Sequence, residues 1–503
     1  MREKQISPEL RRQKTFAIIS KIVSVFIIVA VVFGILAVSF GIYTNQTKKK
    51  KAVIILPGLF ASGLYDTATG KGVWDPFEHL DVYFSDFINH TGLPLGVILS
   101  LLSDNELQNQ LNHITANNSR GDGLSFLSQM GMNEDGTPMV KTIKPVPFDS
   151  DSRLKYGVIN AQTDMYAAME EAYGDTHEVQ VYNYDFRLDN RDSAELLEQY
   201  INSKGYKEVI LVSHSNGGAV AACYLARSQA NRDKVKLNLS LDTPYYGSFS
   251  AINILENING MIDGLVDTLS KNAATSGLAN IISTAFEHQF KPLVNMWAVY
   301  QLLPSYGLLT TQHYYYKWNE EVKGLSGNIT YKTGEIQKSF INIDGEDVFF
   351  EDAEELWDFY CSRPWAKTST GELRIQLKQW LDFQEAMMVT LPDGTKVHST
   401  SLVNSQYFSG MGYRNVSKVY YVTDEFGDLV QDRDNFEYTE QGDGTVLLFS
   451  ATAGTTDSER IHIVPYANHY DMAQRFNEFS KDAVMKVISE SIDNWDHTLN
   501  KIL

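Results

Sequence analysis

The sequence is poor in cysteine, in internal repeats and in low-complexity segments. Its two cysteines, Cys223 and Cys361, are too few for a disulfide framework or a cysteine-rich metal cluster. No internal repeat occurs, and the lysine run at 48–51 is the one low-complexity stretch. A chain of 503 residues that is 43% hydrophobic and 21% charged therefore depends on an ordinary buried core.

Positive charge is scarce over most of the chain. The 62 acidic residues outnumber the 43 lysines and arginines, which gives a formal net charge of −19. Residues 1–51 contain ten lysines and arginines and two glutamates, so residues 52–503 have a net charge of −27. A body this acidic repels phosphate backbones and anionic lipid surfaces. Nucleic acid is therefore not expected as a partner.

The basic N-terminal region contains one long uncharged segment, at 22–43. As a helix this segment would be about 33 Å long, enough to cross a hydrocarbon core of about 30 Å. Cleaved signal peptides have a shorter apolar region, of roughly 7–15 residues, so we expect an uncleaved signal anchor. Six basic residues precede the segment and four follow it. This slight excess favours an N-terminus in the cytoplasm and a catalytic body outside it.

The body of the chain alternates between strand and helix patterns. Short apolar runs predict buried strands at 52–56, 179–184, 208–213 and 235–241. Helical patterns occur between and after them, at 161–173, 193–204 and 217–228. Strands that alternate with helices are typical of a parallel sheet covered on both faces, so the predicted fold class is α/β.

The pattern changes after Gly247. Residues 249–416 contain amphipathic helical stretches and aromatic-rich patches, which predict a mainly helical cap. Strand patterns return at 418–423, 446–449 and 460–464, ahead of a long helix near 471–499. We therefore expect one α/β core formed by residues 52–248 and 417–503. Within it, residues of about 60–150 form an irregular, lid-like insertion, and residues 1–51 precede it as the basic segment and anchor.

The strongest chemical signal is the segment V-S-H-S-N-G-G at 212–218, between a predicted strand and a predicted helix. A sharp strand-to-helix turn exposes a serine hydroxyl at the carboxyl edge of the sheet, where open α/β folds bind ligands. The residues two before and two after such a serine must be small, and Ser213 and Gly217 meet this requirement. Ser215 is therefore the predicted nucleophile.

A serine nucleophile needs a base, and a carboxylate to orient that base. In this fold the order along the chain is Ser, then Asp or Glu, then His. Asp443 lies between two glycines ahead of a predicted strand, and His469 precedes the last helix. His462 is an alternative base within a predicted strand. Asp424 and Asp428, which also follow a strand end, are alternatives to Asp443.

The oxyanion hole is expected to consist of two backbone amides. One belongs to Asn216, directly after the nucleophile, and the other to the turn after the first core strand. That turn begins Pro57-Gly58, and the N–H of Leu59 is the preferred donor, with Phe60 as the next choice. No metal or organic cofactor is implied by these residues.

With these residues identified, the chain resembles the lecithin:cholesterol acyltransferase family, which includes phospholipid:diacylglycerol acyltransferases and lysosomal phospholipase A. The resemblance rests on six ordered pieces: IILPGLFASGL at 54–64, YNYDFRL at 182–188, VILVSHSNGG at 209–218, LDTPYYGS at 241–248, GDGTV at 442–446 and NHYDM at 468–472. It implies an α/β-hydrolase core, the triad Ser215, Asp443 and His469, and lipid ester substrates at a membrane.

The sequence departs from the family pattern at a few positions. Ser213 and Ala61 stand where glycine is usual, and Tyr245-Tyr246 replace a tryptophan-containing stretch. We expect Phe60, Tyr245 and Tyr246 to contact the substrate. The family's disulfide-bridged lid cannot form, because the chain has too few cysteines.

Two functions of different classes follow. The first is a serine-dependent lipid ester hydrolase or acyltransferase, in which an acyl-enzyme on Ser215 passes its chain to water or to a lipid alcohol. The alternative is a catalytically inactive, membrane-tethered scaffold of the same fold that acts as a binding protein. A peptidase or a small-molecule esterase is a further possibility, disfavoured by the predicted anchor and the apolar cap.

Overall fold

The computed structural model describes most of the body of the chain. The described residues are 50–74, 130–147, 163–256, 294–310, 314–317, 330–333, 339–455 and 457–498. The predicted anchor at 22–43 lies outside them, as do most of the lid-like insertion and the beginning of the cap. Within the described residues, no helix is long and apolar enough to cross a membrane.

A six-stranded sheet forms the centre of the molecule, and every strand pair in it is parallel. Its strands, in spatial order, are β17 (Ile461–Pro465), β14 (Ser405–Met411), β7 (Val235–Leu241), β6 (Glu208–His214), β1 (Lys51–Leu56) and β5 (Glu178–Val181). Strands β1 and β6 are buried along almost their whole length. This burial explains their continuous apolar runs, because helices cover both faces of the sheet.

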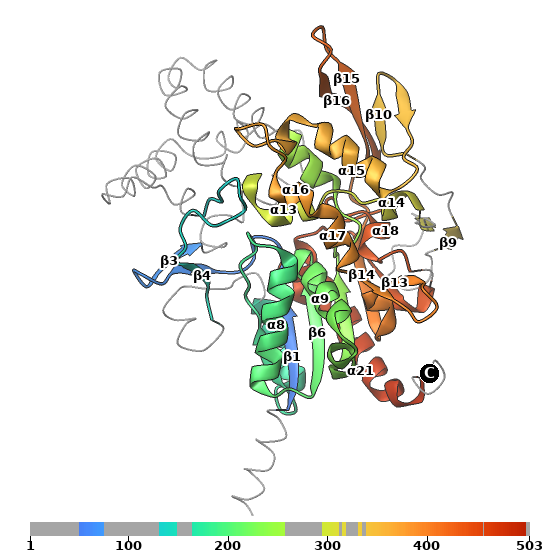
Figure 1. Ribbon diagram of the computed structural model, residues 1–503. Helices are drawn as coiled ribbons and strands as arrows, with labels where there is room; N and C mark the ends of the chain where they lie inside the picture. Colours follow the sequence, from blue (N-terminus) through green and yellow to red (C-terminus); the bar gives the residue numbers. More distant parts are fainter. Residues whose placement is uncertain are drawn as a thin grey trace, which may run out of the picture.

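Alternate residues of β1 face two separate hydrophobic clusters. Ala52, Ile54 and Leu56 pack with α8 (Asn190–Lys204) and α9 (Asn216–Arg227). Val53 and Ile55 pack with α7 (Thr163–Tyr173) and α21 (Lys481–Thr498) on the other face. Figure 1 shows α8 and α9 in front of the strands and α21 behind them. The core is thus a three-layer α/β arrangement, as the alternation of patterns predicted.

Several predicted elements differ from the structure. Strand β14 lies inside the segment predicted as cap, 249–416, so the core sheet resumes before residue 417. The predicted strand 418–423 is part of β15 (Asn415–Thr423), which belongs to a second sheet of order β11-β10-β15-β16. The predicted strand 446–449 is wrong, because Leu448–Ala451 form the short helix α18.

The final helix is also divided. Helices α19 (Asp471–Gln474) and α20 (Phe476–Phe479) precede α21, where one long helix was expected. The second sheet is completed by β10 (Ile341–Ile343), β11 (Glu346–Val348) and β16 (Leu429–Thr439), and its β15–β16 hairpin projects from the body (Figure 1).

The described part of the chain between β7 and β14 combines short helices and short strands. They are α13 (Trp297–Gln301), α14 (Gly307–Thr310), β8 (Tyr314–Lys317), β9 (Thr330–Thr333), α15 (Ala353–Ser362), η2 (Pro364–Ala366), α16 (Ile375–Lys378), α17 (Trp380–Glu385), β12 (Met388–Thr390), β13 (Lys396–His398) and η3 (Ser399–Leu402). Buried aromatic rings hold these pieces together, among them Tyr360 and Trp380, whose ring centroids are 5.5 Å apart. These aromatic residues belong to the same hydrophobic cluster as α8, α9 and one face of β1, so the region packs as an extension of the main core.

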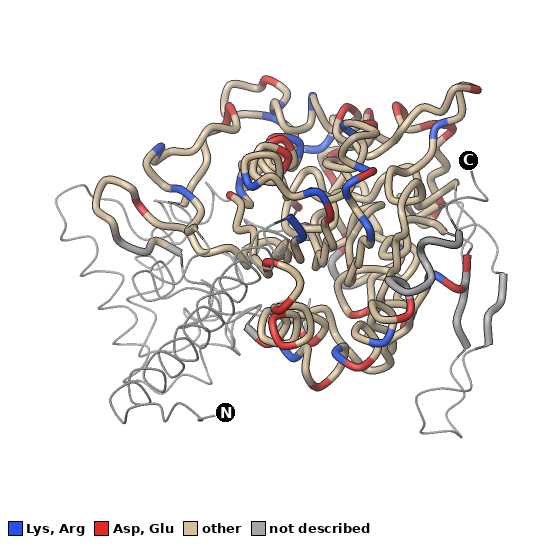
Figure 2. Tube along the Cα trace, turned by 90° about the horizontal axis from the view of Figure 1, so that it is seen from below, with Lys and Arg blue, Asp and Glu red and all other residues tan. Residues whose placement is uncertain are grey.

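The remaining elements lie at the periphery. They are β2 (Leu64–Asp66), β3 (Lys71–Trp74), β4 (Ile143–Pro145), α10 (Gln229–Lys234) and η4 (Ser458–Arg460). Figure 2 shows acidic and basic residues interspersed over the described chain, and many of them form ion pairs at the surface. Such exposed pairs contribute little to stability.

Candidate active site

Ser215 occupies a strained turn between β6 and α9. Its φ of 52° and ψ of −130° lie in a region that residues with a side chain rarely adopt. The two glycines that follow permit this turn. A Cβ at Gly217 would lie 2.4 Å from the carbonyl oxygen of Leu56, and one at Gly218 would lie 1.9 Å from Thr243 Oγ1. The start of α9 can therefore approach β1 only because Gly217 lacks a side chain, and the segment after β7 only because Gly218 lacks one.

Ser213 shows how a serine is accommodated where the family pattern has glycine. Its side chain is fully buried, and its hydroxyl donates a hydrogen bond to the carbonyl oxygen of Leu239 at 3.0 Å. This acceptor lies on the neighbouring strand β7, so the hydroxyl is satisfied inside the sheet. The Ser213 hydroxyl therefore stabilises the sheet and is not an alternative nucleophile to Ser215.

The three side chains of the predicted triad form one hydrogen-bonded chain. Ser215 Oγ lies 2.9 Å from His469 Nε2, and His469 Nδ1 lies 2.6 Å from Asp443 Oδ2. Asp443 is fully buried, and His469 is 8% exposed. Because an ionised carboxylate only accepts, we assign the proton to Nδ1, which leaves Nε2 free to accept the serine proton. This is the tautomer that a general base requires.

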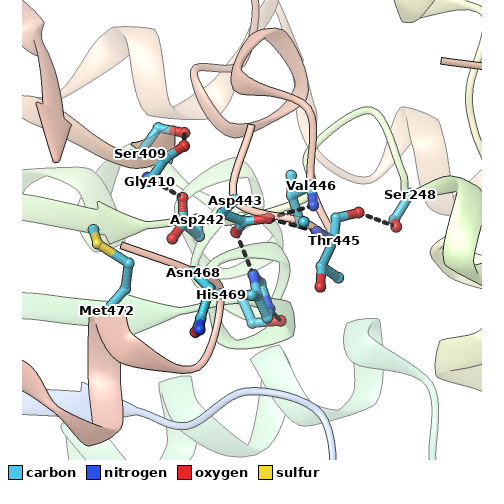
Figure 3. A network of polar contacts seen from close by, with 12 residues as sticks. Asp242, Ser248, Ser409, Gly410, Asp443, Thr445, Val446, Asn468, His469 and Met472 are labelled. Atoms are coloured by element: carbon cyan, nitrogen blue, oxygen red, sulfur yellow. Dashed lines mark hydrogen bonds and ion pairs between the residues drawn. The ribbon is translucent and has the colours of Figure 1, made fainter. Parts of the chain in front are cut away.

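Backbone groups fix the carboxylate of Asp443. Its Oδ1 accepts hydrogen bonds from the N–H groups of Thr445 at 2.7 Å and Val446 at 2.6 Å, as Figure 3 shows. The N–H of His469 donates to the carbonyl oxygen of Asp443 at 3.1 Å, which joins the two loops. Strand β14 lies directly beneath them, and a Cβ at Gly410 would lie 2.9 Å from Asp443 Cβ.

The structure does not bring the alternative residues to Ser215. His462 is bonded through Nε2 to Gln406 Oε1 at 2.8 Å, and its ring stacks on Phe408. Burial lowers the pKa of His462 to about 4. Asp424 and Asp428 lie in the exposed turn of the β15–β16 hairpin, where Asp424 Oδ1 accepts the Asp428 N–H at 2.8 Å.

His214 is a member of the site that sequence reasoning missed. Its Nε2 lies 2.9 Å from the carbonyl oxygen of His469, and the two rings are 4.9 Å apart. Burial lowers the pKa of His214 to about 3, with the neighbouring His469 as a second cause. The imidazole is therefore neutral near pH 7 and donates from Nε2 to that carbonyl. Only its position next to Ser215 could have indicated this role.

The turn predicted to form one side of the oxyanion hole lies against Ser215. A hydrogen bond of 3.1 Å from the Ala61 N–H to the Gly58 carbonyl closes the turn, and Phe60 has a φ of 62°. A Cβ at Gly58 would lie 2.9 Å from Ser215 Cβ and 3.5 Å from its Oγ. Gly58 thus lies against Ser215, and Leu59, the predicted oxyanion donor, is the next residue in the chain.

Asn216 lies on the other side of the serine, in the first turn of α9. Backbone N–H groups in a first helical turn have no acceptor within the helix, so they are available to an oxyanion. The Asn216 side chain is also fixed. Its Nδ2 donates to the Tyr184 hydroxyl at 3.1 Å, and it exchanges two hydrogen bonds of 2.9 Å with the side chain of Asn190.

Tyr184 connects the two sides of the predicted oxyanion hole. Its hydroxyl accepts from Asn216 and donates to the carbonyl oxygen of Pro57 at 2.8 Å. The side chain is 2% exposed, and burial raises the pKa of its hydroxyl. Tyr184 belongs to the YNYDFRL piece at 182–188, yet nothing in the sequence indicated that it reaches the turn after β1.

The three residues predicted to contact substrate are placed differently from one another. Tyr245 is wrongly assigned, because it is 1% exposed, its hydroxyl lies 3.0 Å from Ser240 Oγ, and its ring packs on His398. Tyr246 is half-buried and donates to the carbonyl oxygen of Ala453 at 3.0 Å. Phe60 is half-buried, with its ring 5.0 Å from that of Phe186. A substrate contact stays a prediction for Phe60 and Tyr246.

One group of three possible metal ligands occurs among the described residues, and it overlaps the triad. Oxygen and nitrogen atoms of Asp242, Asp443 and His469 lie within 4.8 Å of one another. Both oxygens of Asp443 already accept N–H groups, and a cation on this side would displace the His469 proton. The donor set therefore suits proton transfer rather than metal binding.

Comparison with known proteins supports a lipid-acting family. The family model described as lecithin:cholesterol acyltransferase matches residues 148–477, a range that includes Ser215, Asp443 and His469. A comparison with the sequences of curated proteins gave no match.

Two solved structures show distant likenesses. A chain described as "The crystal structure of Tle4-Tli4 complex" is 13% identical, with a TM-score of 0.38 over 84% of this chain and 95% of that chain. A Bacillus megaterium epoxide hydrolase in complex with an inhibitor is 10% identical, with a TM-score of 0.24 over 66% of this chain and 89% of that chain. The fold assignment rests on the parallel sheet and its helices.

Proposed function

The chain belongs to the lecithin:cholesterol acyltransferase family, and on this premise we propose that it cleaves lipid esters through an acyl-enzyme on Ser215. Family membership supports an activity on lipid acyl groups in general, by hydrolysis or by transfer. The observation that carries the serine mechanism is the chain of hydrogen bonds from Ser215 Oγ through His469 to Asp443, at 2.9 and 2.6 Å.

In the first step, Ser215 Oγ attacks the ester carbonyl while His469 Nε2 takes the hydroxyl proton. The resulting imidazolium is stabilised by Asp443, and the N–H groups of Leu59 and Asn216 bind the oxyanion. One such donor typically contributes on the order of 3 kcal/mol to transition-state stabilisation. Collapse of the tetrahedral intermediate expels the lipid alcohol, which takes the proton from His469.

In the second step, His469 deprotonates an acceptor that attacks the acyl-enzyme and releases Ser215. Water gives a fatty acid, and a lipid alcohol gives a new ester. The preference depends on which acceptor the covering elements admit. Product analysis with a labelled phospholipid, with and without diacylglycerol or a sterol, separates the two outcomes, because transfer requires the added alcohol.

Labelling by a fluorophosphonate probe tests the nucleophile. We expect the wild-type protein to be labelled and Ser215→Ala to be folded and unlabelled. Ser213→Ala is the matched control, because it removes a neighbouring buried hydroxyl that donates to Leu239. Labelling that persists in Ser215→Ala would remove this serine from the mechanism.

The same experiment separates the enzyme from an inactive scaffold. A binding protein of this fold would neither take up the probe nor turn over a short-chain nitrophenyl ester. The hydrogen bonds between His469 Nε2 and Ser215 Oγ and between His469 Nδ1 and Asp443 support the enzyme.

We also propose the arrangement of the covering parts and the anchor. The chain between β7 and β14, together with the insertion at about 60–150, would form the lipid-facing cover. Residues 22–43 would anchor a body that lies outside the cytoplasm. Carbonate extraction tests the anchor: we expect the wild type in the membrane pellet, and Val31→Arg/Val32→Arg in the supernatant, because charges at mid-membrane are costly.

A further inference from the structure

A second buried aspartate lies beside the triad, and the mechanism above does not use it. Asp242 follows β7 at the carboxyl edge of the sheet, has a φ of 48°, and is fully buried. Its N–H donates to the carbonyl oxygen of Phe408, and its Oδ1 accepts the Gly410 N–H at 2.8 Å. The neighbouring strand β14 therefore fixes both its backbone and one of its oxygens.

The side chain of Asp242 lies beside the catalytic carboxylate. Figure 3 shows Asp242 next to Asp443, and ligand atoms of these two residues and His469 lie within 4.8 Å of one another. Asp242 Oδ2 is buried and receives no hydrogen bond from any N–H or O–H group of the described residues. Two ionised carboxylates so close together in a buried site repel strongly, so the pair is stable only when it shares a proton.

The hydrogen-bond donors decide which carboxyl holds this proton. Asp443 accepts three N–H groups, from Thr445, Val446 and His469, and each favours its ionised form. Asp242 accepts one backbone N–H, from Gly410. Burial and the charge of Asp443 raise the pKa of Asp242 well above its ordinary value, against the smaller, opposite effects of Gly410 and Ser409.

We propose that Asp242 is a positioning residue, a neutral carboxylic acid that donates a hydrogen bond from Oδ2 to the carboxylate of Asp443. This inference rests on the proposed function of the triad. With a fourth donor, Asp443 cannot turn away from His469, and part of its charge is spread over Asp242. The proton of Asp242 stays in place throughout the reaction. The proton transfers through His469 in the two acyl-transfer steps are therefore unchanged.

Two substitutions separate this role from a merely structural one. Asp242→Asn keeps a neutral donor and the acceptor for Gly410, and Asn tolerates a positive φ. We expect its kcat to stay within about threefold of the wild type, because the hydrogen bond to Asp443 remains. Asp242→Ala removes that hydrogen bond, and we expect kcat to fall about 10- to 100-fold with little change in KM.

Asp344→Ala is the matched control. Asp344 also has a positive φ, of 53°, and accepts a backbone N–H, but it lies in the exposed turn between β10 and β11. Its replacement therefore reproduces the cost of an alanine in a left-handed conformation without touching the triad. We expect Asp344→Ala to retain the wild-type kcat.

The pH profile of kcat/KM reports the protonation state of Asp242. The titratable groups that face it are Asp443 and His469, and His214 is the next imidazole, with a pKa of about 3. The acid limb thus reports His469. We expect this limb to be unchanged in Asp242→Asn and to move to higher pH in Asp242→Ala, where the Asp443 charge is less spread. A limb that moves to lower pH in Asp242→Asn would show an ionised Asp242 and overturn the proposal.

Infrared difference spectroscopy tests the proton without any activity. At pH 8, the spectrum of the wild type minus that of Asp242→Asn is expected to show the C=O stretching band of a buried carboxylic acid. If this band is absent, Asp242 is not protonated and the proposal is wrong, even if the enzyme is active. If the band is present but the protein does not react with the fluorophosphonate probe, the proposed function is wrong. The protonated Asp242 is supported in that case all the same. An unchanged kcat and pH profile in Asp242→Ala would exclude the positioning role.

Discussion

At the scale of single residues, the site depends on side chains that hold backbone groups in place. Tyr184 joins Pro57, the first residue of the predicted oxyanion turn, to Asn216, which follows the nucleophile. His214 holds the carbonyl of His469. Both are neutral groups in buried surroundings, so they fix geometry without adding charge to the site.

Tyr184→Phe removes the hydroxyl and leaves the ring in the core. We expect kcat to fall about tenfold, less than the 10²–10³ that follows the loss of an oxyanion donor itself, because the amides remain and lose only their support. Steady-state kinetics on a nitrophenyl ester measure this change. Thermal unfolding serves as the control, and an unchanged kcat would show that the turn is held by other contacts.

Gly58→Ala tests the close approach of the turn to the nucleophile. The added methyl group would lie 2.9 Å from Ser215 Cβ and 3.1 Å from His214 Nδ1, so the turn must move. A displacement of about 1 Å costs roughly 10²-fold in rate, and we expect a loss of this size in kcat/KM. Fluorophosphonate labelling should slow in parallel. Wild-type labelling rates would mean that the turn does not contribute to the reaction.

Part of the site could be predicted at this scale, and part could not. Ser215, Asp443 and His469 stand in short segments whose turn residues and order indicate their chemistry. Asp242 and Tyr184 make contacts with segments far away in the sequence, which a single sequence does not encode locally. Tyr245 was misassigned because an aromatic residue beside a predicted site has the same pattern whether it lies in the core or lines a pocket.

At the scale of elements, one buried ion pair joins three parts of the chain. Arg363, at the end of α15, donates to Glu256 Oε1 at 2.8 Å and to the carbonyl oxygen of Leu429 on β16 at 2.8 Å. Tyr421, on β15, donates to the same carboxylate at 3.0 Å, and its ring lies 4.5 Å from the guanidinium. Both charged side chains are less than 10% exposed.

Arg363→Met is therefore expected to destabilise the folded protein. Loss of the cation leaves Glu256 buried and unpaired, which typically costs about 3–5 kcal/mol. Urea unfolding measures the loss, and Arg363→Met/Glu256→Gln should recover part of it, because the uncompensated charge is removed. Equal stabilities of the single and the double variant would show that the two side chains are not coupled.

The elements also show why some of the fold escaped prediction. Strand β14 is almost wholly buried, yet its sequence, SQYFSGM, contains two serines, a glutamine and a glycine. Its serine hydroxyls are satisfied inside the fold, for example Ser405 Oγ by the carbonyl oxygen of Thr400. The residues around α18 form an apolar run, and periodicity alone does not separate a short buried helix from a strand. For β15, the alternation predicted a strand, but not the sheet that it joins.

At the scale of the whole molecule, buried neutral histidines make stability depend on pH. Burial lowers the pKa of His214 to about 3 and the pKa values of His398 and His462 to about 4. In the unfolded chain these groups have a pKa near 6.5. Between the two values the unfolded state binds protons that the folded state excludes, so the free energy of unfolding decreases as the pH falls below about 6.5.

Urea unfolding at a series of pH values checks this dependence. Each such histidine contributes up to about 1.4 kcal/mol per pH unit within its window. His462→Gln should reduce the slope between pH 6 and pH 4.5, because one of the three groups no longer titrates. A slope identical to that of the wild type would mean that His462 also takes up its proton in the folded state.

The place of β14 in the sheet has a consequence for the newborn polypeptide. Residues 51–241 contain β5, β1, β6 and β7 and the turn that bears Ser215, so all of these are translated before β14. The edge strand β17 pairs with β14, and the segments bearing the acid and the imidazole follow β14 on the chain. A nascent chain therefore contains Ser215 well before it contains Asp443 and His469. On the proposed mechanism, a chain that ends before these segments cannot activate Ser215.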